Sequence, residues 1–383
     1  MTATASRWVR VGLAMPPKPP FGTLRQALVL CRLLRFDSFL VWDHLQDLVS
    51  RSLWQPETTW AAKAGESPHQ FFDFQTTLGA LAARAGRVRL GVAVTEPVRR
   101  HPVVIAQAML TLAHLSFRAP ILGLGAGERG NTEPYGLNVE TGVSRLEEAL
   151  QLIRLCFSGE SPLQFEGSFF RLDQAHFDLK APPGRTPRIW IGGTGPRMLR
   201  LTGAHGDGWY PTGALTPGEY QAKLGLIHDA ARLAGRDPNR IMPSFQPVIV
   251  AAPTEEAARQ LLDHPMIRYL GLLLPAATWE ERGYRHPFGP AYRGYHDLLP
   301  ERYTAAETRA AIAAAIAAVP VDLAEAGLIW GTPRQIIRRL HDYVDSGLRY
   351  IVPQLPALMV SRRAALYNIR LLHTIAAEFR RPV

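Results

Sequence analysis

The sequence predicts a parallel (β/α)8 barrel, the TIM-barrel fold, because short apolar strands alternate with amphipathic helices along almost the whole chain. About eight such units fit into the 383 residues, and eight is the number that the barrel needs. A doubly wound open sheet is the alternative. The turn at residues 15–21 argues against it, because this turn is rich in proline and lacks the G-x-G-x-x-G pattern of a dinucleotide-binding sheet. We therefore expect one barrel domain over residues 1–383, with insertions at about 45–70, 160–182 and 263–301.

The first half of the chain contains four of the expected strands, which alternate with helices whose apolar residues recur three and four positions apart. The strands are expected at residues 7–15, 38–42, 88–94 and 119–124, and the helices at 23–36, 74–85 and 102–115. The run Ser144-Arg145-Leu146-Glu147 has the form of a capping box, so we expect the next helix to begin near Ser144 and to run to Phe157.

The second half continues the same alternation, after a small β excursion that we expect at residues 162–179. Further strands are expected at residues 187–191, 208–210, 241–251 and 348–352. Helices are expected at residues 217–233, 254–262, 305–319, 334–346 and 361–379.

The chain carries a net charge of +10, and its excess of arginine is scattered through the sequence and not grouped in blocks. Such scatter argues against a nucleic-acid-binding stripe. It is compatible with an anionic small molecule, with an anionic membrane surface, or with an arginine-rich proteome and no such partner. The apolar segments are too short to span a bilayer, and no signal core follows the first residues. Cys31 and Cys156 are expected to be buried free thiols, so we expect a cytoplasmic protein.

Polar side chains follow several of the expected strands at the point where each strand ends. The set consists of Asp43-His44, Thr95-Glu96, Glu128, the glycine turn at 192–194, and Thr212. The carboxyl ends of the strands meet at one mouth of a TIM barrel, where such enzymes place their chemistry. The set contains no Ser-His-Asp order and no H-E-x-x-H motif, and His44 and Glu128 would supply only two ligands to a metal.

His44 and Glu128 are the candidate catalytic residues. An imidazole exchanges protons near neutral pH, so His44 is a candidate proton donor or acceptor. The alternatives are that His44 is a structural residue and that Glu128 caps or pairs with the next helix.

The run Gly192-Gly193-Thr194-Gly195-Pro196 is a candidate phosphate cradle, because glycines bring backbone N–H groups together where a helix begins. The alternative is an ordinary turn between a strand and a helix. One histidine, one glutamate and such a cradle, without a metal, indicate a site that moves protons around a phosphorylated cofactor.

Five stretches together resemble one family: FLVWDHL at residues 39–45, residues 90–95 with RRHPVVIAQ at 99–107, ILGLGAGERGNTEPYG at 121–136, IWIGGTGPRML at 189–199 and residues 347–352. They are similar to the luciferase-like superfamily of barrel flavoenzymes, and in particular to its branch that uses the deazaflavin coenzyme F-420. The resemblance covers nearly the whole chain. Within that branch, the runs EPYG at residues 133–136, HPFG at 286–289 and DLLP at 297–300 look most like the mycobacterial phthiodiolone ketoreductases, which reduce a keto group on a long lipid.

The resemblance implies roles for particular residues of this chain. His44 would lie beside the reactive carbon of the cofactor, and Glu128 would lie near its ring. The peptide bond near Ala93-Val94 would be cis, as it is in relatives. The cofactor contacts that the resemblance implies are Asp43, Ala93, Val94, Thr95, Asn131, Gly192, Gly193 and Thr194.

The resemblance also implies hydride transfer between C5 of F-420 and a carbonyl or alcohol carbon. The reaction would most simply be ketone reduction, on a small or lipid-like substrate, by a homodimer. An FMN-dependent monooxygenase of the same fold is one alternative, and an F-420-dependent alcohol or sugar-phosphate dehydrogenase is another. The sugar-phosphate alternative is disfavoured because Leu48 stands where those relatives carry a tryptophan, and because their phosphate-binding lysine is missing at Gly213-Ala214.

Overall fold

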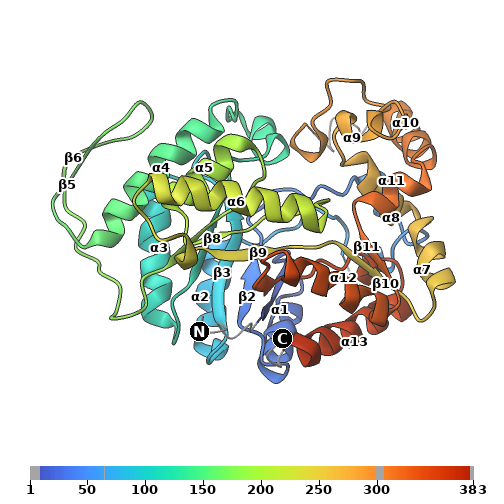
Figure 1. The fold of residues 1–383 in the computed structure, drawn as a ribbon, viewed down its shortest axis with the longest axis horizontal. Helices are drawn as coiled ribbons and strands as arrows, with labels where there is room; N and C mark the ends of the chain where they lie inside the picture. The colour runs from blue at the N-terminus through green and yellow to red at the C-terminus, as the bar shows by residue number, and fades with distance from the viewer. Residues whose placement is uncertain (1–8, 64, 298–305, 380–383) are drawn as a thin grey trace, which may run out of the picture.

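A closed barrel of eight parallel strands forms the centre of the molecule and confirms the expected TIM-barrel fold (Figure 1). The computed structural model describes residues 9–63, 65–297 and 306–379. Around the barrel the strands follow the order β1-β12-β9-β8-β7-β4-β3-β2. Their bounds are Arg10–Met15 (β1), Ser38–Val41 (β2), Arg89–Thr95 (β3), Ile121–Leu124 (β4), Arg188–Ile191 (β7), Gly208–Trp209 (β8), Met242–Phe245 (β9) and Tyr350–Ile351 (β12).

Helices cover the outside of the barrel and bury their apolar faces against the strands. On α1, for example, Leu24, Leu28 and Cys31 are buried one helical turn apart. Both cysteines are buried and free, as expected, and burial raises the pKa of the Cys156 thiol to about 11. The outer helices are Phe21–Leu33 (α1), Phe74–Ala85 (α2), Pro102–Leu115 (α3), Gly142–Ser158 (α4), Pro196–His205 (α5), Pro217–Leu233 (α6), Pro333–Asp345 (α12) and Arg362–Phe379 (α13).

The expected capping box at the start of α4 is wrong. The helix begins earlier than expected, with Thr141 as its N-cap residue, so Ser144 already lies within the first turn. Ser144 and Glu147 instead receive hydrogen bonds from the guanidinium group of Arg197 on α5, at 3.0 and 2.6 Å. A contact between two neighbouring helices therefore accounts for the Ser-x-x-Glu pattern.

The expected strand at residues 241–251 is divided into two. Its first part is β9 of the barrel, whereas β10 (Ile249–Ala251) leaves the barrel and pairs in parallel with β11 (Ile329–Gly331). Pro247 lies between the two parts, and a proline has no N–H group to donate to a strand ladder. The interruption by Pro247 explains why one apolar run forms two short strands.

Two excursions extend beyond the barrel. The strands β5 (Leu163–Glu166) and β6 (Arg171–Ala175) form an antiparallel hairpin, which projects at the left of Figure 1. At the right of the same view lies a lobe of short helices, α7 (Glu255–Leu262), α8 (Pro265–Leu272), α9 (Ala276–Glu280), α10 (Ala306–Ala317) and α11 (Val321–Ala326). Residues 298–301 of the expected third insertion lie outside the described residues.

The lobe packs on the segment that follows β2. Val49 and Leu53 from that segment share one buried apolar cluster with Met266, Tyr269 and other side chains of the lobe. The hydroxyl of Tyr269 donates a hydrogen bond to the carbonyl of Leu48 at 2.6 Å. Single turns of 3-10 helix occur at Arg51–Leu53, Trp60–Lys63, Arg129–Asn131, Glu133–Tyr135, Pro238–Arg240, Gly294–His296 and Pro356–Met359.

None of the helices in the described part of the chain combines the length and the apolar character that crossing a bilayer requires.

Helices α5 and α6 approach each other closely at Gly203. A Cβ atom at this position would lie 2.5 Å from the Cβ of Ala230 and 2.6 Å from the carbonyl oxygen of Ile227. Because these neighbours belong to a packed helix, the two helices would have to move apart to admit a methyl group.

We predict that Gly203→Ala lowers the free energy of unfolding by about 1–3 kcal/mol, the usual cost of overpacking a core. The matched control is Gly225→Ala, because Gly225 lies within α6 and a Cβ there would have no neighbour within 4 Å. That substitution should instead stabilise the protein by about 0.5–1 kcal/mol through helix propensity. Urea denaturation of the two variants measures both values, and equal effects would contradict the close helix contact.

Candidate active site

His44 and Glu128 lie together at the carboxyl-terminal mouth of the barrel. They follow β2 and β4, the two strands that flank β3. His44 Nε2 lies 3.5 Å from Glu128 Oε2, and both side chains are partly buried. The rings of Trp42 and Phe71 flank the imidazole, with centroids 5.7 and 5.5 Å away. The geometry allows one proton to pass between the two side chains and to a group bound at the mouth.

Asn131 connects the Glu128 segment to the loop that follows His44. Its Nδ2 donates to Glu128 Oε2 at 3.1 Å, and its Oδ1 accepts from the backbone N–H groups of Leu45 and Gln46 at 2.7 and 3.1 Å. Asn131 is buried. The amide therefore holds two loops in a fixed relation, and its expected contact with a cofactor stays a prediction.

Asp43 is buried beneath the mouth, where several donors surround its carboxylate. Thr95 Oγ1 donates to Asp43 Oδ2 at 2.6 Å, and Arg100 Nη1 does so at 2.7 Å. Arg99 Nη2 lies 3.0 Å from the same oxygen. Two guanidinium groups therefore face the same oxygen of this buried carboxylate. Among the described residues, Oδ1 of Asp43 receives no hydrogen bond, so this oxygen can accept one from a bound molecule.

Arg99 is a site residue that the sequence analysis did not single out. It donates to the backbone carbonyl of Asp43 at 2.7 Å and pairs with Glu96. Burial disfavours its charged form. The nearby carboxylates of Asp43, Glu96 and Glu128 outweigh burial and raise the pKa of the Arg99 guanidinium. The signal in the sequence was the pair Arg99-Arg100, a few residues after the end of the third strand.

The floor of the mouth contains the expected cis peptide bond between Ala93 and Val94. The pairing of β3 with β4 shifts register at this point, between Val92 and Thr95. Val94 turns its side chain toward the neighbouring strand ends, where a Cβ on Gly123 or Gly192 would lie 2.9 or 3.4 Å from its Cγ1. These glycines leave room for Val94, which can present an apolar surface to a flat ring.

The glycine turn after β7 leads directly into α5. Gly193 has a φ of +129° and Gly195 is the N-cap residue, without a side-chain hydrogen bond to the helix. Trp209 Nε1 donates to the carbonyl of Gly193 at 2.9 Å, and Lys223 Nζ donates to that of Thr194 at 3.3 Å. The turn thus combines an uncapped helix N-terminus with a lysine, the arrangement that attracts a phosphate group. Sequence reasoning did not find Lys223, because it comes from the next helix.

Several buried polar atoms around the mouth lack hydrogen-bond partners among the described residues. They are His44 Nδ1, Arg99 Nη1, Tyr210 Oη and Gln246 Nε2. Burial raises the pKa of the Tyr210 hydroxyl, so it stays a neutral donor. Buried polar groups in folded proteins are normally paired, so four such atoms near one opening fit a polar molecule that binds there. Together with the glycine turn, the residues present fit a phosphorylated ring cofactor.

Tyr295, from the lobe, also lies close enough to Glu128 for their charges to interact. Burial raises the pKa of its hydroxyl, and the negative charge of Glu128 raises it further. The third insertion therefore contributes a side chain close to the predicted site, which the strand-end rule could not indicate.

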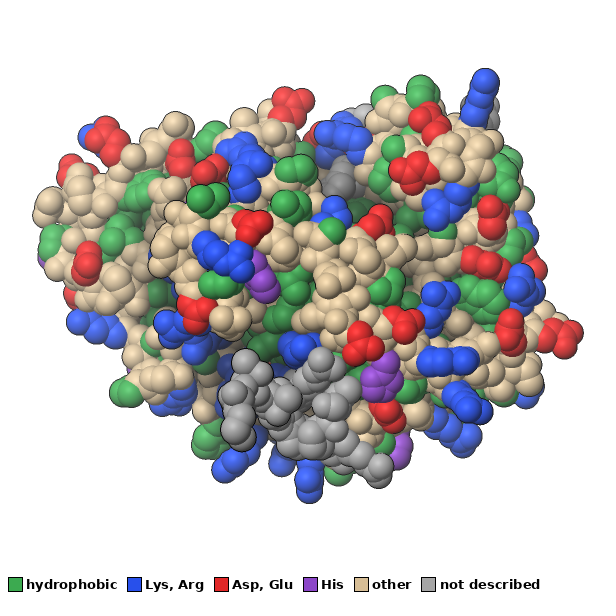
Figure 2. Space-filling model, viewed as in Figure 1, with side chains coloured by type: hydrophobic (Ala, Val, Ile, Leu, Met, Phe, Trp, Pro, Cys, Tyr) green, Lys and Arg blue, Asp and Glu red, His purple; other side chains and the backbone are tan. Residues whose placement is uncertain are grey.

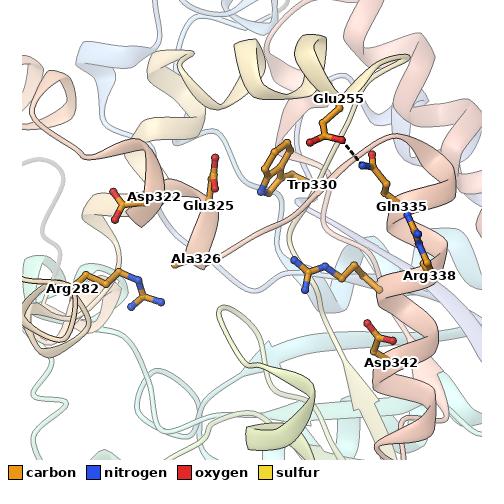
Figure 3. Close-up of a pocket in the computed structure, with 10 residues that line it drawn as sticks. Glu255, Arg282, Asp322, Glu325, Ala326, Trp330, Gln335, Arg338 and Asp342 are labelled. Carbon is orange, nitrogen blue, oxygen red and sulfur yellow. Dashed lines mark hydrogen bonds between the residues drawn. The ribbon is translucent and has the colours of Figure 1, made fainter.

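A cleft of about 640 Å³ lies to one side of the mouth, between the lobe and α12 (Figure 3). Arg282 points into it from the lobe, and Glu255 on α7 accepts a hydrogen bond from Gln335 Nε2 at 2.6 Å. None of the site residues expected from the sequence lines this cleft. Of the expected residues, His44, Glu128 and Asn131 lie together at the mouth instead.

Comparisons with known proteins agree with this architecture. A family model described as luciferase-like monooxygenase matches residues 51–350. The phthiodiolone/phenolphthiodiolone dimycocerosates ketoreductase of Mycobacterium sp. (strain JLS) is 35% identical over 97% of this chain and 98% of its own length. The F-420-dependent glucose-6-phosphate dehydrogenase of Nakamurella multipartita is 29% identical over 89% of each chain.

Solved structures share the fold. An F-420-dependent secondary alcohol dehydrogenase in complex with an F-420–acetone adduct superposes with a TM-score of 0.73 at 18% identity, covering 98% of this chain and 100% of that one. The F-420-dependent tetrahydromethanopterin reductase of Methanopyrus kandleri has a TM-score of 0.71 at 17% identity, covering 97% and 98%. From the family model and the relative that is 35% identical over nearly its whole length, we conclude that the chain belongs to the luciferase-like family of barrel enzymes.

Proposed function

We propose that this protein is an F-420-dependent oxidoreductase that reduces a ketone on a lipid-like substrate to a secondary alcohol. The observation that carries the proposal is the His44–Glu128 pair at the mouth, next to an uncapped glycine turn that suits a phosphate. The relative at 35% identity is named as a ketoreductase, and the one at 29% as an F-420-dependent dehydrogenase. Both names support transfer between a carbonyl and an alcohol carbon.

In this proposal the cofactor is held at three places. The backbone N–H groups of Gly193 and Thr194, with Lys223 nearby, would bind its phosphate at the start of α5. Val94 would support the ring from behind. The free Oδ1 of Asp43 would accept a hydrogen bond from a hydroxyl group of the cofactor. When bound, reduced F-420 supplies a hydride from C5.

Residues of the chain manage the proton. Reduction of a ketone adds a hydride to the carbon and a proton to the oxygen, so the developing alkoxide needs a donor. His44 Nε2 is the proposed donor, because it lies at the opening and has Glu128 Oε2 at 3.5 Å as its acid–base partner. Asn131 keeps Glu128 in place and is a positioning residue. In the oxidative direction the same pair would accept the proton.

Apolar surroundings support a lipid-like substrate over a sugar phosphate. Trp42 and Phe71 flank His44, and the apolar side chain of Leu45 is exposed beside it. A long alkyl chain lying along these side chains would bury apolar surface, the main source of affinity for such a molecule.

A cytoplasmic homodimer is part of the same proposal. The outer face of α3 exposes Val104 and Leu115, and such apolar side chains on a barrel helix suit an interface between two copies. Sedimentation of the purified protein tests this state.

We predict that reduced F-420 is reoxidised when the enzyme is mixed, without oxygen, with a long-chain methyl ketone. Recovery of F-420 fluorescence and formation of the secondary alcohol measure the reaction. The control is FMN in place of F-420, since the family model is described as a monooxygenase. Tight FMN binding accompanied by ketone-dependent oxygen consumption would instead assign the protein to the alternative function.

We predict that His44→Gln lowers kcat by about 100-fold to 10,000-fold, because proton donation contributes a factor of this size. Binding of F-420, followed by fluorescence quenching, should change little. His373→Gln, on the exposed face of α13, is the matched control and should retain full activity. Turnover of either His44→Gln or His44→Ala within a few-fold of the wild type would show that His44 is not the donor.

Asn131→Ala separates a positioning role from a cofactor contact. If Asn131 acts through Glu128, we predict that kcat falls by about tenfold or more, while the Kd for F-420 changes less than about twofold. Asn239→Ala, in the exposed single turn Pro238–Arg240, is the control. An increased Kd for F-420 with unchanged kcat would show that Asn131 contacts the cofactor and does not act by positioning Glu128.

A further inference from the structure

The end of the barrel opposite the mouth has a strongly basic surface. A cavity of about 730 Å³ opens there, lined by Arg10, Arg32, Arg35, Arg87 and Arg118 together with apolar side chains. Asp37 is the one acid among the described residues that line it. In Figure 2, Lys and Arg side chains gather along the lower edge of the molecule. We call this surface, together with the exposed Leu33, Phe117 and Leu233 at the same end of the barrel, the basic face.

The barrel explains why these arginines meet although they are far apart in the sequence. Arg10 begins β1, and Arg35, Arg87 and Arg118 each come a few residues before β2, β3 and β4. The amino-terminal ends of parallel barrel strands lie at one end of the barrel, away from the active site. Residues that precede strands are therefore collected on that end.

The single acid of the cavity is already neutralised. Arg118 Nη1 donates to Asp37 Oδ1 at 2.9 Å, and Tyr350 donates to Oδ2 at 2.9 Å. Burial by itself would raise the pKa of the Asp37 carboxyl. The positive charges of Arg89, Arg118 and Arg10 outweigh this effect of burial and hold the pKa below its usual value.

In contrast, the side chains of Arg10, Arg35 and Arg87 make no hydrogen bond or ion pair with any described residue. The charges of Arg35 and Arg87 are available to an external anion, whereas Arg10 already acts on Asp37.

Large apolar side chains stand beside the arginines. Leu33 at the end of α1 is 73% exposed, Phe117 after α3 is 76% exposed, and Leu233 at the end of α6 is 90% exposed. In a TIM barrel the helices end where the strands begin, so these side chains belong to the same end of the molecule as the arginines. Leu33 and Phe117 are direct sequence neighbours of Arg32 and Arg118. Cations and protruding apolar groups are thus mixed on one surface.

We propose that the basic face docks on an anionic lipid bilayer. Arginines near an anionic membrane each strengthen binding about fivefold, and Leu or Phe side chains can enter the boundary between headgroups and acyl chains. A soluble polyanion would contact the arginines but would not bury the apolar side chains of Leu33 or Phe117. The mouth lies at the opposite end and stays open when the protein is docked. The proposal is therefore independent of the reaction assigned to His44.

Co-sedimentation with vesicles tests the proposal on the full-length protein. Binding is expected to vesicles of phosphatidylcholine mixed with phosphatidylglycerol, to decrease with added salt, and to be much weaker with phosphatidylcholine alone. Arg35→Gln with Arg87→Gln should lower the partition coefficient about 30-fold. Leu33→Ser with Phe117→Ser should lower it about tenfold. Oxidoreductase activity on a soluble ketone should be unchanged by vesicles and by these substitutions.

Arg363→Gln with Leu366→Ser is the matched control, since both residues are exposed and lie in the first turns of α13, whose other end lines the cavity. This variant should bind vesicles as the wild type does. Equal loss in the control, or equal binding to neutral vesicles, overturns the proposal. The proposal is also overturned if the arginine variant loses vesicle binding while the Leu33/Phe117 variant retains it in full. That result assigns the face to a soluble polyanion such as a nucleic acid. Unchanged thermal unfolding excludes misfolding as the cause.

Discussion

Closure of the parallel barrel is the constraint on which the rest of the structure depends. β1 pairs with β12 on one side and with β2 on the other, and this pairing joins the first and last strands of the chain. Once the barrel is closed, every strand must present its carboxyl end at the same mouth. The adjacency of β2, β3 and β4 then brings His44, Thr95 and Glu128 together from three separate segments.

Asp43 and Glu128 lie in different electrostatic surroundings at the mouth. Asp43 is buried and surrounded by Thr95, Arg99 and Arg100, so its charge is balanced within the protein. Removing one partner of such a buried group would leave an uncompensated charge, which is costly. Among the described residues, the Asn131 amide donates to Glu128 Oε2 and His44 Nε2 lies 3.5 Å from it, and the Glu128 side chain is more exposed than that of Asp43. The proton chemistry that we propose therefore falls to Glu128 and His44, while Asp43 serves as a fixed anchor.

The two ends of the barrel differ in composition for a topological reason. The carboxyl-terminal end carries Asp43, Glu128, the glycine turn and the lobe of short helices, and it is the end where we propose that a small molecule binds. The amino-terminal end collects the arginines that precede the strands and the apolar residues that end the helices. Net charge alone could not distinguish these two ends, because the sequence shows only that arginine is in excess.

The sequence by itself determined the architecture, because alternating local patterns of strand and helix allow few ways of burying both, and it located the strand ends that carry His44 and Glu128. It misplaced the start of α4 and joined β9 to β10, since the contacts of Arg197 and the effect of Pro247 depend on neighbours in space. Only the tertiary structure decided that Asn131 bridges two loops, that Arg99 joins the mouth, and that scattered arginines form one face. Each of these facts depends on strand register and on contacts between distant segments, which a local pattern does not contain.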